Sequence, residues 1–81
     1  MSSKLTLADA QQRLVIIQGC IENYEPIKAK SHIQLLLNEL GYSLTVTWEH
    51  FSFLRQNPDL LDAQAVLKGD LVDMLKLNFA I

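Results

Sequence analysis

Segment 57–77 constrains the fold most, because it opens with the clearest helix-start signal in the chain. Asn57 can cap a helix, Pro58 suits the first helical position, and Asp59 places a negative charge at the positive end of the helix dipole. Apolar residues follow at helical spacing: Leu60, Leu61, Leu67, Leu71, Met74 and Leu75. The pattern predicts one long helix over 57–77, in which Gly69 marks either a close helix contact or a break.

A second long helix is predicted over 7–23. Thr6 precedes it as a capping residue, and Asp9, three residues later, completes an approximate capping box. The apolar residues then step by three and four, as one face of a helix requires. Glu25 precedes Pro26, and a residue before proline disfavours helical geometry, so this helix should end by residue 23.

A third long helix is predicted to end at Gly41, which can adopt the left-handed conformation that closes many helices. Two starts are open. Pro26 can be the first helical residue, or Ser31 can cap the helix, with Gln34 completing a capping box. Under either start, a stripe of isoleucine and leucine forms the apolar face.

Segment 42–56 carries two patterns at once. Apolar and polar residues alternate from Tyr42 to Trp48, which favours a strand, whereas the apolar spacing from Leu44 to Leu54 favours a helix. We expect extended chain to Val46, a cap at Thr47 and a short helix over 48–55. Segment 74–81 also alternates, so the two segments could pair as strands, and a dimer could build four strands from them.

The predicted fold class is therefore mainly α: a compact bundle of three long helices plus one short helix, in a single domain over 1–81. The alternative is an α+β fold with strands near 42–48 and 74–81. A chain of 81 residues has a small core, yet 25 residues are Leu, Ile or Val. This excess of aliphatic residues predicts that some apolar side chains remain on the surface, where a second subunit or another protein covers them.

Charge and composition point to a cytoplasmic protein. A net charge of −2 argues against electrostatic attachment to nucleic acid or anionic lipid. The single cysteine, Cys20, cannot form an internal disulfide. Apolar runs are too short for a membrane span, and the N-terminal residues do not have the pattern of a signal peptide. We expect no membrane association.

No chemical motif predicts catalysis, a metal site or a cofactor. Cys20, His32 and His50 lie 12 and 18 residues apart, without the close ligand pairs of structural zinc sites. Cys20 is expected to be a packed side chain. Glu49 and His50 are adjacent and would point about 100° apart on a helix, so they cannot form a catalytic pair. The three glycines are isolated, so no phosphate-binding loop is predicted.

One stretch, 40–43, resembles the turn of a helix-turn-helix motif. The second helix of that motif should turn apolar residues inward six and nine positions beyond Gly41, but Thr47 and His50 stand there. It also has no basic residue before Arg55, whereas base and phosphate contacts require Arg, Lys, Asn or Gln. A helix-turn-helix DNA-binding regulator is therefore the alternative function, and nucleic acid is not the expected partner.

The favoured function is a small cytoplasmic protein that acts by binding another protein, in a regulatory or accessory role and as a homodimer. Large aromatic residues dominate the binding energy of interfaces. The candidate partner-binding residues are Trp48, Phe51, Phe53, Phe79 and Ile81. The competing interpretation is that Trp48 and Phe51 fill the small core. Phe53 is expected to be the most exposed of the three rings in 48–53.

Overall fold

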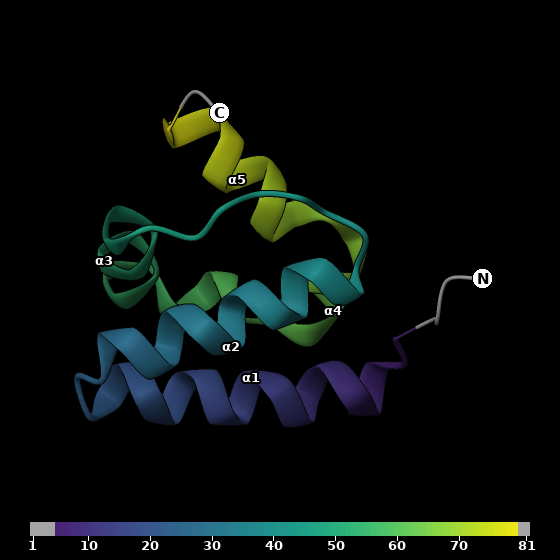
Figure 1. Ribbon diagram of the computed structural model, residues 1–81. Helices are drawn as coiled ribbons and strands as arrows, with labels where there is room; N and C mark the ends of the chain where they lie inside the picture. The colour runs from purple at the N-terminus through teal and green to yellow at the C-terminus, as the bar shows by residue number, and fades with distance from the viewer. Residues whose placement is uncertain (1–4, 80–81) are drawn as a thin grey trace.

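The computed structural model describes residues 5–79, and these residues form a mainly α-helical protein (Figure 1). The elements of this range are α1 (Leu7–Glu22), α2 (Pro26–Glu39), α3 (Trp48–Gln56), the 3₁₀ helix η1 (Pro58–Leu60), α4 (Ala63–Lys68) and α5 (Asp70–Phe79). The Cα radius of gyration is 11.5 Å, close to the value of about 12 Å expected for a compact domain of this length. The predicted mainly α fold is confirmed.

Helices α1 and α2 form an antiparallel pair, and Figure 1 shows them side by side. The Thr6 hydroxyl accepts from the Asp9 N–H at 3.1 Å, and the Asp9 carboxylate accepts from the Thr6 N–H at 3.3 Å, so the predicted capping box is confirmed. Helix α2 begins at Pro26 without a side-chain cap, which selects the earlier of its two predicted starts. Arg13 and Glu39 pair across the two helices, with Nη2 2.7 Å from Oε2.

The inner faces of all the α-helices meet in one core. The side chains most completely buried are Phe51, Ile17, Ile33, Leu36, Leu37, Leu54, Leu71, Leu75, Val66 and Val72. Cys20 is also buried, as expected for a packed side chain. Every α-helix therefore contributes residues to the core, and truncating a core side chain in any one of them would destabilise the whole fold.

Helix α2 ends as predicted, and an extended segment follows it. Gly41 has a φ of +91°, and the Tyr42 N–H then donates to the Leu37 carbonyl at 2.9 Å. Residues 42–47 cross from the end of α2 to the start of α3 (Figure 1). This connection is longer than the three- or four-residue turn of a helix-turn-helix motif.

The α+β alternative is not supported, because no strand forms in residues 5–79. A side-chain amide takes the place of a neighbouring strand: Gln34 of α2 donates to the Leu44 carbonyl at 2.7 Å and accepts from the Val46 N–H at 2.9 Å. The second predicted strand, 74–81, lies within α5 as far as Phe79, and its last two residues are outside the described range.

One continuous helix over 57–77 does not form, because the chain breaks twice in that range; the second break, at Gly69, is the one that the sequence left open. Pro58–Leu60 form only a 3₁₀ turn, and the Asn57 side chain makes no cap hydrogen bond; it donates instead to the Phe53 carbonyl at 2.9 Å. The true cap is Asp62, whose carboxylate accepts from the Ala65 N–H at 3.1 Å. Gly69, with a φ of +91°, ends α4 and turns the chain into α5.

Candidate partner-binding surface

Helix α3 positions the most exposed large aromatic ring among the predicted site residues. Thr47 caps this helix, with its hydroxyl oxygen 3.4 Å from the His50 N–H, as the sequence predicts. Trp48 is therefore the first helical residue, and its side chain is 47% exposed. Phe51, one turn later, is fully buried beneath it. The two rings lie 5.4 Å apart between centroids, so Trp48 rests on a ring that is fixed in the core.

The end of α1 brings in a second aromatic residue, Tyr24, in an unusual backbone conformation. The Glu25 N–H donates to the Cys20 carbonyl at 2.8 Å, and the Tyr24 N–H donates to the Ile21 carbonyl at 3.1 Å. These two bonds form the Schellman ending, whose left-handed residue is usually glycine. Here that residue is Tyr24, with a φ of +52°. A side chain in this region costs roughly 1 kcal/mol.

Tyr24, Trp48, Phe51 and Arg55 together form what we call the aromatic surface. The Tyr24 ring meets Trp48 edge-on at 6.2 Å and Phe51 edge-on at 5.8 Å, and such arrangements are the favourable ones for aromatic pairs. The Arg55 guanidinium lies 4.9 Å from the Tyr24 ring centroid, within cation–π range. Tyr24 is 51% exposed, so the surface presents two rings and one cation to solvent.

Arg55 is the positive charge of the aromatic surface. Among residues 5–79 its guanidinium forms no ion pair; the ion pairs in this range are Arg13–Glu39 and Lys28–Glu25, the latter at 3.5 Å. Stacking on Tyr24 leaves the edge of the guanidinium, with its N–H donors, free to bind a carboxylate or a carbonyl. The aromatic surface can therefore combine apolar contact with one directional, charge-assisted hydrogen bond.

A separate aromatic cluster lies on the other side of α3. The Phe79 ring meets His50 at 4.7 Å and Phe53 at 5.5 Å, both edge-on. His50 is 2% exposed, and its Nδ1 accepts from the Thr47 N–H at 3.0 Å. Burial lowers the pKa of His50 below its ordinary value, and the neighbouring Glu49 carboxylate opposes part of that effect. The imidazole is thus held neutral, with the proton on Nε2, and helps to cap the helix.

The structure separates the residues that the sequence groups as one site. Trp48 is exposed, Phe51 is buried, and Phe53 is half-buried against Phe79, so the expectation that Phe53 is the most exposed ring is wrong. Ile81 lies outside the described residues. Tyr24 was not among the predicted residues, because its place beside Trp48 depends on the left-handed ending of α1. The Tyr24-Glu25-Pro26 sequence, which forces a sharp helix end, is the signal that could have indicated it.

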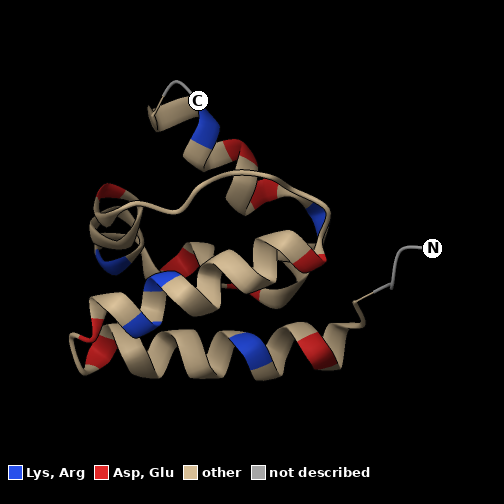
Figure 2. Cartoon of the chain, in the orientation of Figure 1, with Lys and Arg blue, Asp and Glu red and all other residues tan. Residues whose placement is uncertain are grey.

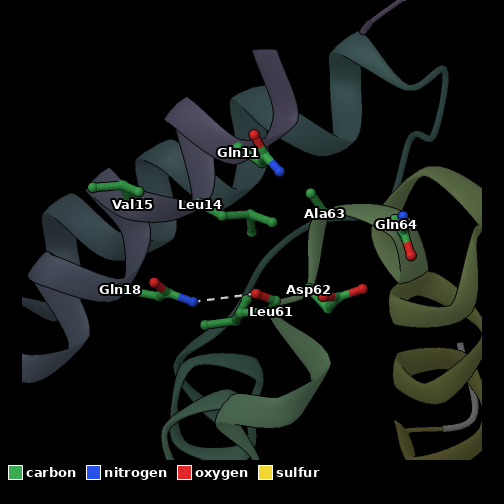
Figure 3. A pocket seen from close by; sticks show the side chains of 8 residues that line it. All are labelled: Gln11, Leu14, Val15, Gln18, Leu61, Asp62, Ala63 and Gln64. Atoms are coloured by element: carbon green, nitrogen blue, oxygen red, sulfur yellow. Dashed lines mark hydrogen bonds between the residues drawn. The ribbon is translucent and has the colours of Figure 1, made fainter. Parts of the chain in front are cut away.

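A groove of about 650 Å³ lies between α1 and the start of α4 (Figure 3). Its lining residues are Gln11, Leu14, Val15, Gln18, Leu61, Asp62, Ala63 and Gln64. Two of its polar groups already serve the fold: Gln18 donates to the Leu61 carbonyl at 3.1 Å, and Asp62 caps α4. This groove therefore offers fewer free recognition groups than its size suggests.

Two other features concern metals and membranes. Within residues 5–79, no three or more His, Cys, Asp or Glu side chains come close enough together to hold a metal ion. In the same range, no helix has both the length and the apolar character needed to cross a bilayer.

Comparisons of the chain with models of protein families, with curated proteins and with solved structures gave no match, so no relative assigns a role to these residues.

Proposed function

We propose that this protein is a small cytoplasmic regulatory or accessory protein that acts by binding another protein, not by catalysis, and that it works as a homodimer. The aromatic surface is the proposed site for the other protein. The observation that carries the proposal is the half-exposed Trp48 ring, stacked on a buried Phe51 and bordered by Tyr24 and Arg55.

The residue types support this choice. Trp, Tyr and Arg are the three residues most enriched at interface positions where truncation costs 2 kcal/mol or more. Here all three stand together in 24–55, each in contact with at least one of the others. Because Phe51 and the capped helix α3 hold Trp48 in place, a partner would order little additional side chain on binding.

The backbone at Tyr24 gives independent support. A residue in the left-handed region is an outlier that often marks a functional position, since the surrounding structure must offset its cost. Glycine at this position would end α1 without that backbone cost, but it would remove the ring from the aromatic surface. Retaining tyrosine here is consistent with a use for its exposed ring beyond helix termination.

A protein partner fits the charge distribution better than nucleic acid does. Figure 2 shows acidic and basic residues spread along the chain, and no helix carries more than two basic residues. Electrostatic attachment to a phosphate backbone requires basic residues gathered on one face. No observation in the described residues favours the helix-turn-helix alternative, so we do not propose it.

The test is a quantitative capture experiment. Purified wild-type protein and the variants Trp48→Ala and Tyr24→Ala are immobilised and exposed to lysate of the source cells, and bound proteins are quantified by mass spectrometry. We expect one bound protein to lose roughly thirtyfold in affinity with Trp48→Ala, the loss that corresponds to a 2 kcal/mol hot spot. The purified partner then confirms the affinities by calorimetry.

Leu77→Ala is the matched control, because Leu77 is 77% exposed on α5 and is also a large apolar residue. Its removal should leave the captured protein unchanged. Circular dichroism of each variant must show wild-type helicity before binding is compared. If the same proteins bind with equal affinity to wild type and to Trp48→Ala, the aromatic surface is not the binding site.

A further inference from the structure

Helix α3 begins with a capping box in which a histidine stands where glutamate or glutamine is usual. The Thr47 N–H donates to Nδ1 of His50 at 3.0 Å, and the Thr47 hydroxyl oxygen lies 3.4 Å from the His50 N–H. Only a neutral imidazole with its proton on Nε2 can accept at Nδ1. The start of α3 therefore depends on a side chain that gains a proton in mildly acidic solution.

Protonation of His50 would turn this favourable contact into an unfavourable one. Both ring nitrogens of an imidazolium are donors, so Nδ1 would face the Thr47 N–H with no acceptor between them. The new positive charge would also lie at the N-terminus of α3, where the helix dipole is itself positive. Because His50 is 2% exposed, water could not compensate for the lost bond while the imidazole stays in place.

The groups packed around His50 offer little compensation for a positive charge. The Phe79 ring of α5 meets the imidazole edge-on at 4.7 Å, and Leu44 and Thr45 of the preceding extended segment line the same groove. None of these three is charged, and among residues 5–79 Glu49 is the one charged group that acts on the imidazole. Burial lowers the pKa of His50 more than Glu49 raises it. A conformation that exposes the imidazole to water therefore binds the proton more tightly than the capped one does.

Trp48 lies in the turn that this capping box stabilises. It is the first residue of α3, between Thr47 and His50. Its ring rests on Phe51 at 5.4 Å and meets Tyr24 at 6.2 Å. Phe51 is fully buried and anchors the next turn in the core, so the first turn can open while the rest of α3 stays in place. Local opening of a helix end costs less free energy than unfolding the whole domain.

The capping box of α1 and the ion pair between α1 and α2 differ from that of α3 in their response to acid. Hydrogen bonding to Thr6 lowers the pKa of Asp9, and the hydrogen bond from Arg13 lowers the pKa of Glu39. Both carboxylates therefore stay ionised in mild acid, in which histidine binds a proton. Mild acid should weaken the start of α3 and leave the start of α1 and its ion pair with α2 intact.

We propose that His50 is a positioning residue of the aromatic surface, and that proton binding to its imidazole uncaps α3 and releases Trp48 from Tyr24 and Phe51. The inference rests on the proposed function in one respect, because Trp48 is the proposed contact to the partner protein. The release itself is a property of this chain alone. Lowering the pH raises the released population by up to about tenfold for each unit by which the pKa of His50 differs between the two states.

The fluorescence of Trp48 tests the release, because this residue is the single tryptophan of the chain. Quenching of its emission by acrylamide is measured on the purified protein between pH 7.5 and pH 5.0. An NMR titration follows the His50 imidazole in the same samples. We expect the quenching constant to roughly double at full release, since a ring that is 47% exposed becomes open to water. The midpoint of this change should coincide with the titration of His50.

His50→Gln is the matched variant, because glutamine is a usual member of the capping box and does not titrate. It should accept from the Thr47 N–H at every pH, so its quenching constant should not change between pH 7.5 and pH 5.0. His32→Gln is the control. It removes the other histidine of the chain, which lines a hollow between α1 and α2, and should keep the response of the wild type. Circular dichroism of both variants must show wild-type helicity at pH 7.5.

Amide hydrogen exchange on the wild type separates local opening from global unfolding. The Phe51 N–H donates to the Thr47 carbonyl at 3.2 Å, and the Ala10 N–H donates to the Thr6 carbonyl at 2.9 Å. Each amide therefore reports on one of the two capping boxes. After correction for the effect of pH on intrinsic exchange, protection of the Phe51 amide should fall at pH 5.0, whereas protection of the Ala10 amide should persist.

Several results would overturn the proposal. They are constant quenching while His50 titrates, a His50 imidazole that remains neutral at pH 5.0, a response retained by His50→Gln, and equal loss of protection at Phe51 and Ala10. All of them leave the proposed function standing, because no partner takes part in these measurements. Failure of the capture experiment with Trp48→Ala overturns the proposed function and leaves the proton-dependent release of Trp48 unaffected.

Discussion

At the scale of single residues, Tyr24 shows how a local cost can be offset by contacts elsewhere. Its backbone is left-handed, which disfavours any side chain by roughly 1 kcal/mol. Its ring makes two aromatic contacts and one cation–π contact, with helix α3 as the source of all three partners. Each such contact contributes about 0.5–1 kcal/mol, so together they can offset the backbone cost.

Comparing Tyr24→Gly with Tyr24→Ala isolates the backbone cost. Both variants lose the ring contacts, but only alanine keeps a side chain in the left-handed region. We expect Tyr24→Gly to be more stable than Tyr24→Ala by about 1 kcal/mol in urea denaturation. The same pair of substitutions at Gln12, an exposed position within α1, should give the opposite order. Equal stability of the two Tyr24 variants would show that Tyr24 is not left-handed.

His50 predicts a dependence of stability on pH. Burial lowers its pKa in the folded state, so the unfolded chain binds the proton more readily. The contribution of neutral His50 to the free energy of unfolding is therefore complete above about pH 6.5, the ordinary histidine pKa. It is lost as the pH falls from there toward the lower pKa of His50 in the folded protein. We expect the urea concentration at the unfolding midpoint of the wild type to be lower at pH 5.5 than at pH 7.5.

The variant His50→Asn should reduce that slope, because it removes the titrating group, whereas His32→Asn retains His50 and should keep the slope. An NMR titration of the His50 imidazole gives the folded pKa directly. A His50 pKa above about 6.5 in the folded protein would contradict the burial argument.

At the scale of elements, helix ends account for both the success and the failure of prediction from sequence. Capping boxes at Thr6 and Thr47 depend on residues three apart, so the starts of α1 and α3 could be predicted from the neighbouring sequence. Asn57-Pro58-Asp59 carries a similar local signal, yet Asp62 is the residue that caps the following α-helix. Local chemistry permits both starts, and the tertiary packing of Leu61 and Ala63 in the core selects the later one.

The corrected helix start predicts a contrast between two substitutions. Asp62→Ala should destabilise the protein by about 1 kcal/mol, because it removes the carboxylate that accepts from the Ala65 N–H. Asn57→Ala should cost less than about 0.5 kcal/mol, because its side chain makes one exposed bond to the Phe53 carbonyl. The urea midpoints of the two variants measure these losses of stability. A larger loss for Asn57→Ala than for Asp62→Ala would support the long helix over 57–77.

Two glycines predict opposite effects of the same change. A Cβ at Gly19 would meet no atom within 4 Å, so Gly19→Ala should stabilise α1 by roughly 0.5–1 kcal/mol. Gly69 has a φ of +91°, and its Cβ would lie 2.9 Å from the Tyr42 hydroxyl, so Gly69→Ala should destabilise by at least about 1 kcal/mol. Thermal midpoints of both variants should move in opposite directions; a shift in the same direction would contradict the break between α4 and α5.

Gln34 explains why the alternative of a paired strand at 42–48 is wrong, although the predicted extended chain and its alternation are real. Alternation correctly indicates extended chain with Leu44 inward, because that periodicity follows from backbone geometry. Whether such a chain finds a strand partner depends on residues distant in sequence. Here a side-chain amide of α2 supplies the two inner hydrogen bonds, and no local pattern could have indicated that contact.

At the scale of the whole molecule, the candidate site was harder to predict from the sequence than the fold. Helical periodicity and caps are local, so the mainly α bundle followed from the sequence. The aromatic surface joins Tyr24 at the end of α1 to three residues of α3, and that proximity arises only when α1, α2 and α3 pack together. Composition indicated Trp48 and Phe51, but the separation of Phe53 and Phe79 into another cluster required the three-dimensional arrangement.

The central claim is that the aromatic surface contacts another protein in the cell, and site-specific photocrosslinking tests it most directly. The photoreactive residue p-benzoylphenylalanine replaces Trp48, which is 47% exposed, in one variant and the more accessible Leu77, which is 77% exposed, in another. Irradiation should join the position-48 variant to a discrete partner protein, with little or no such adduct from position 77. Equal adducts from both positions, or none from position 48 while position 77 reacts, would contradict the assignment of the binding site.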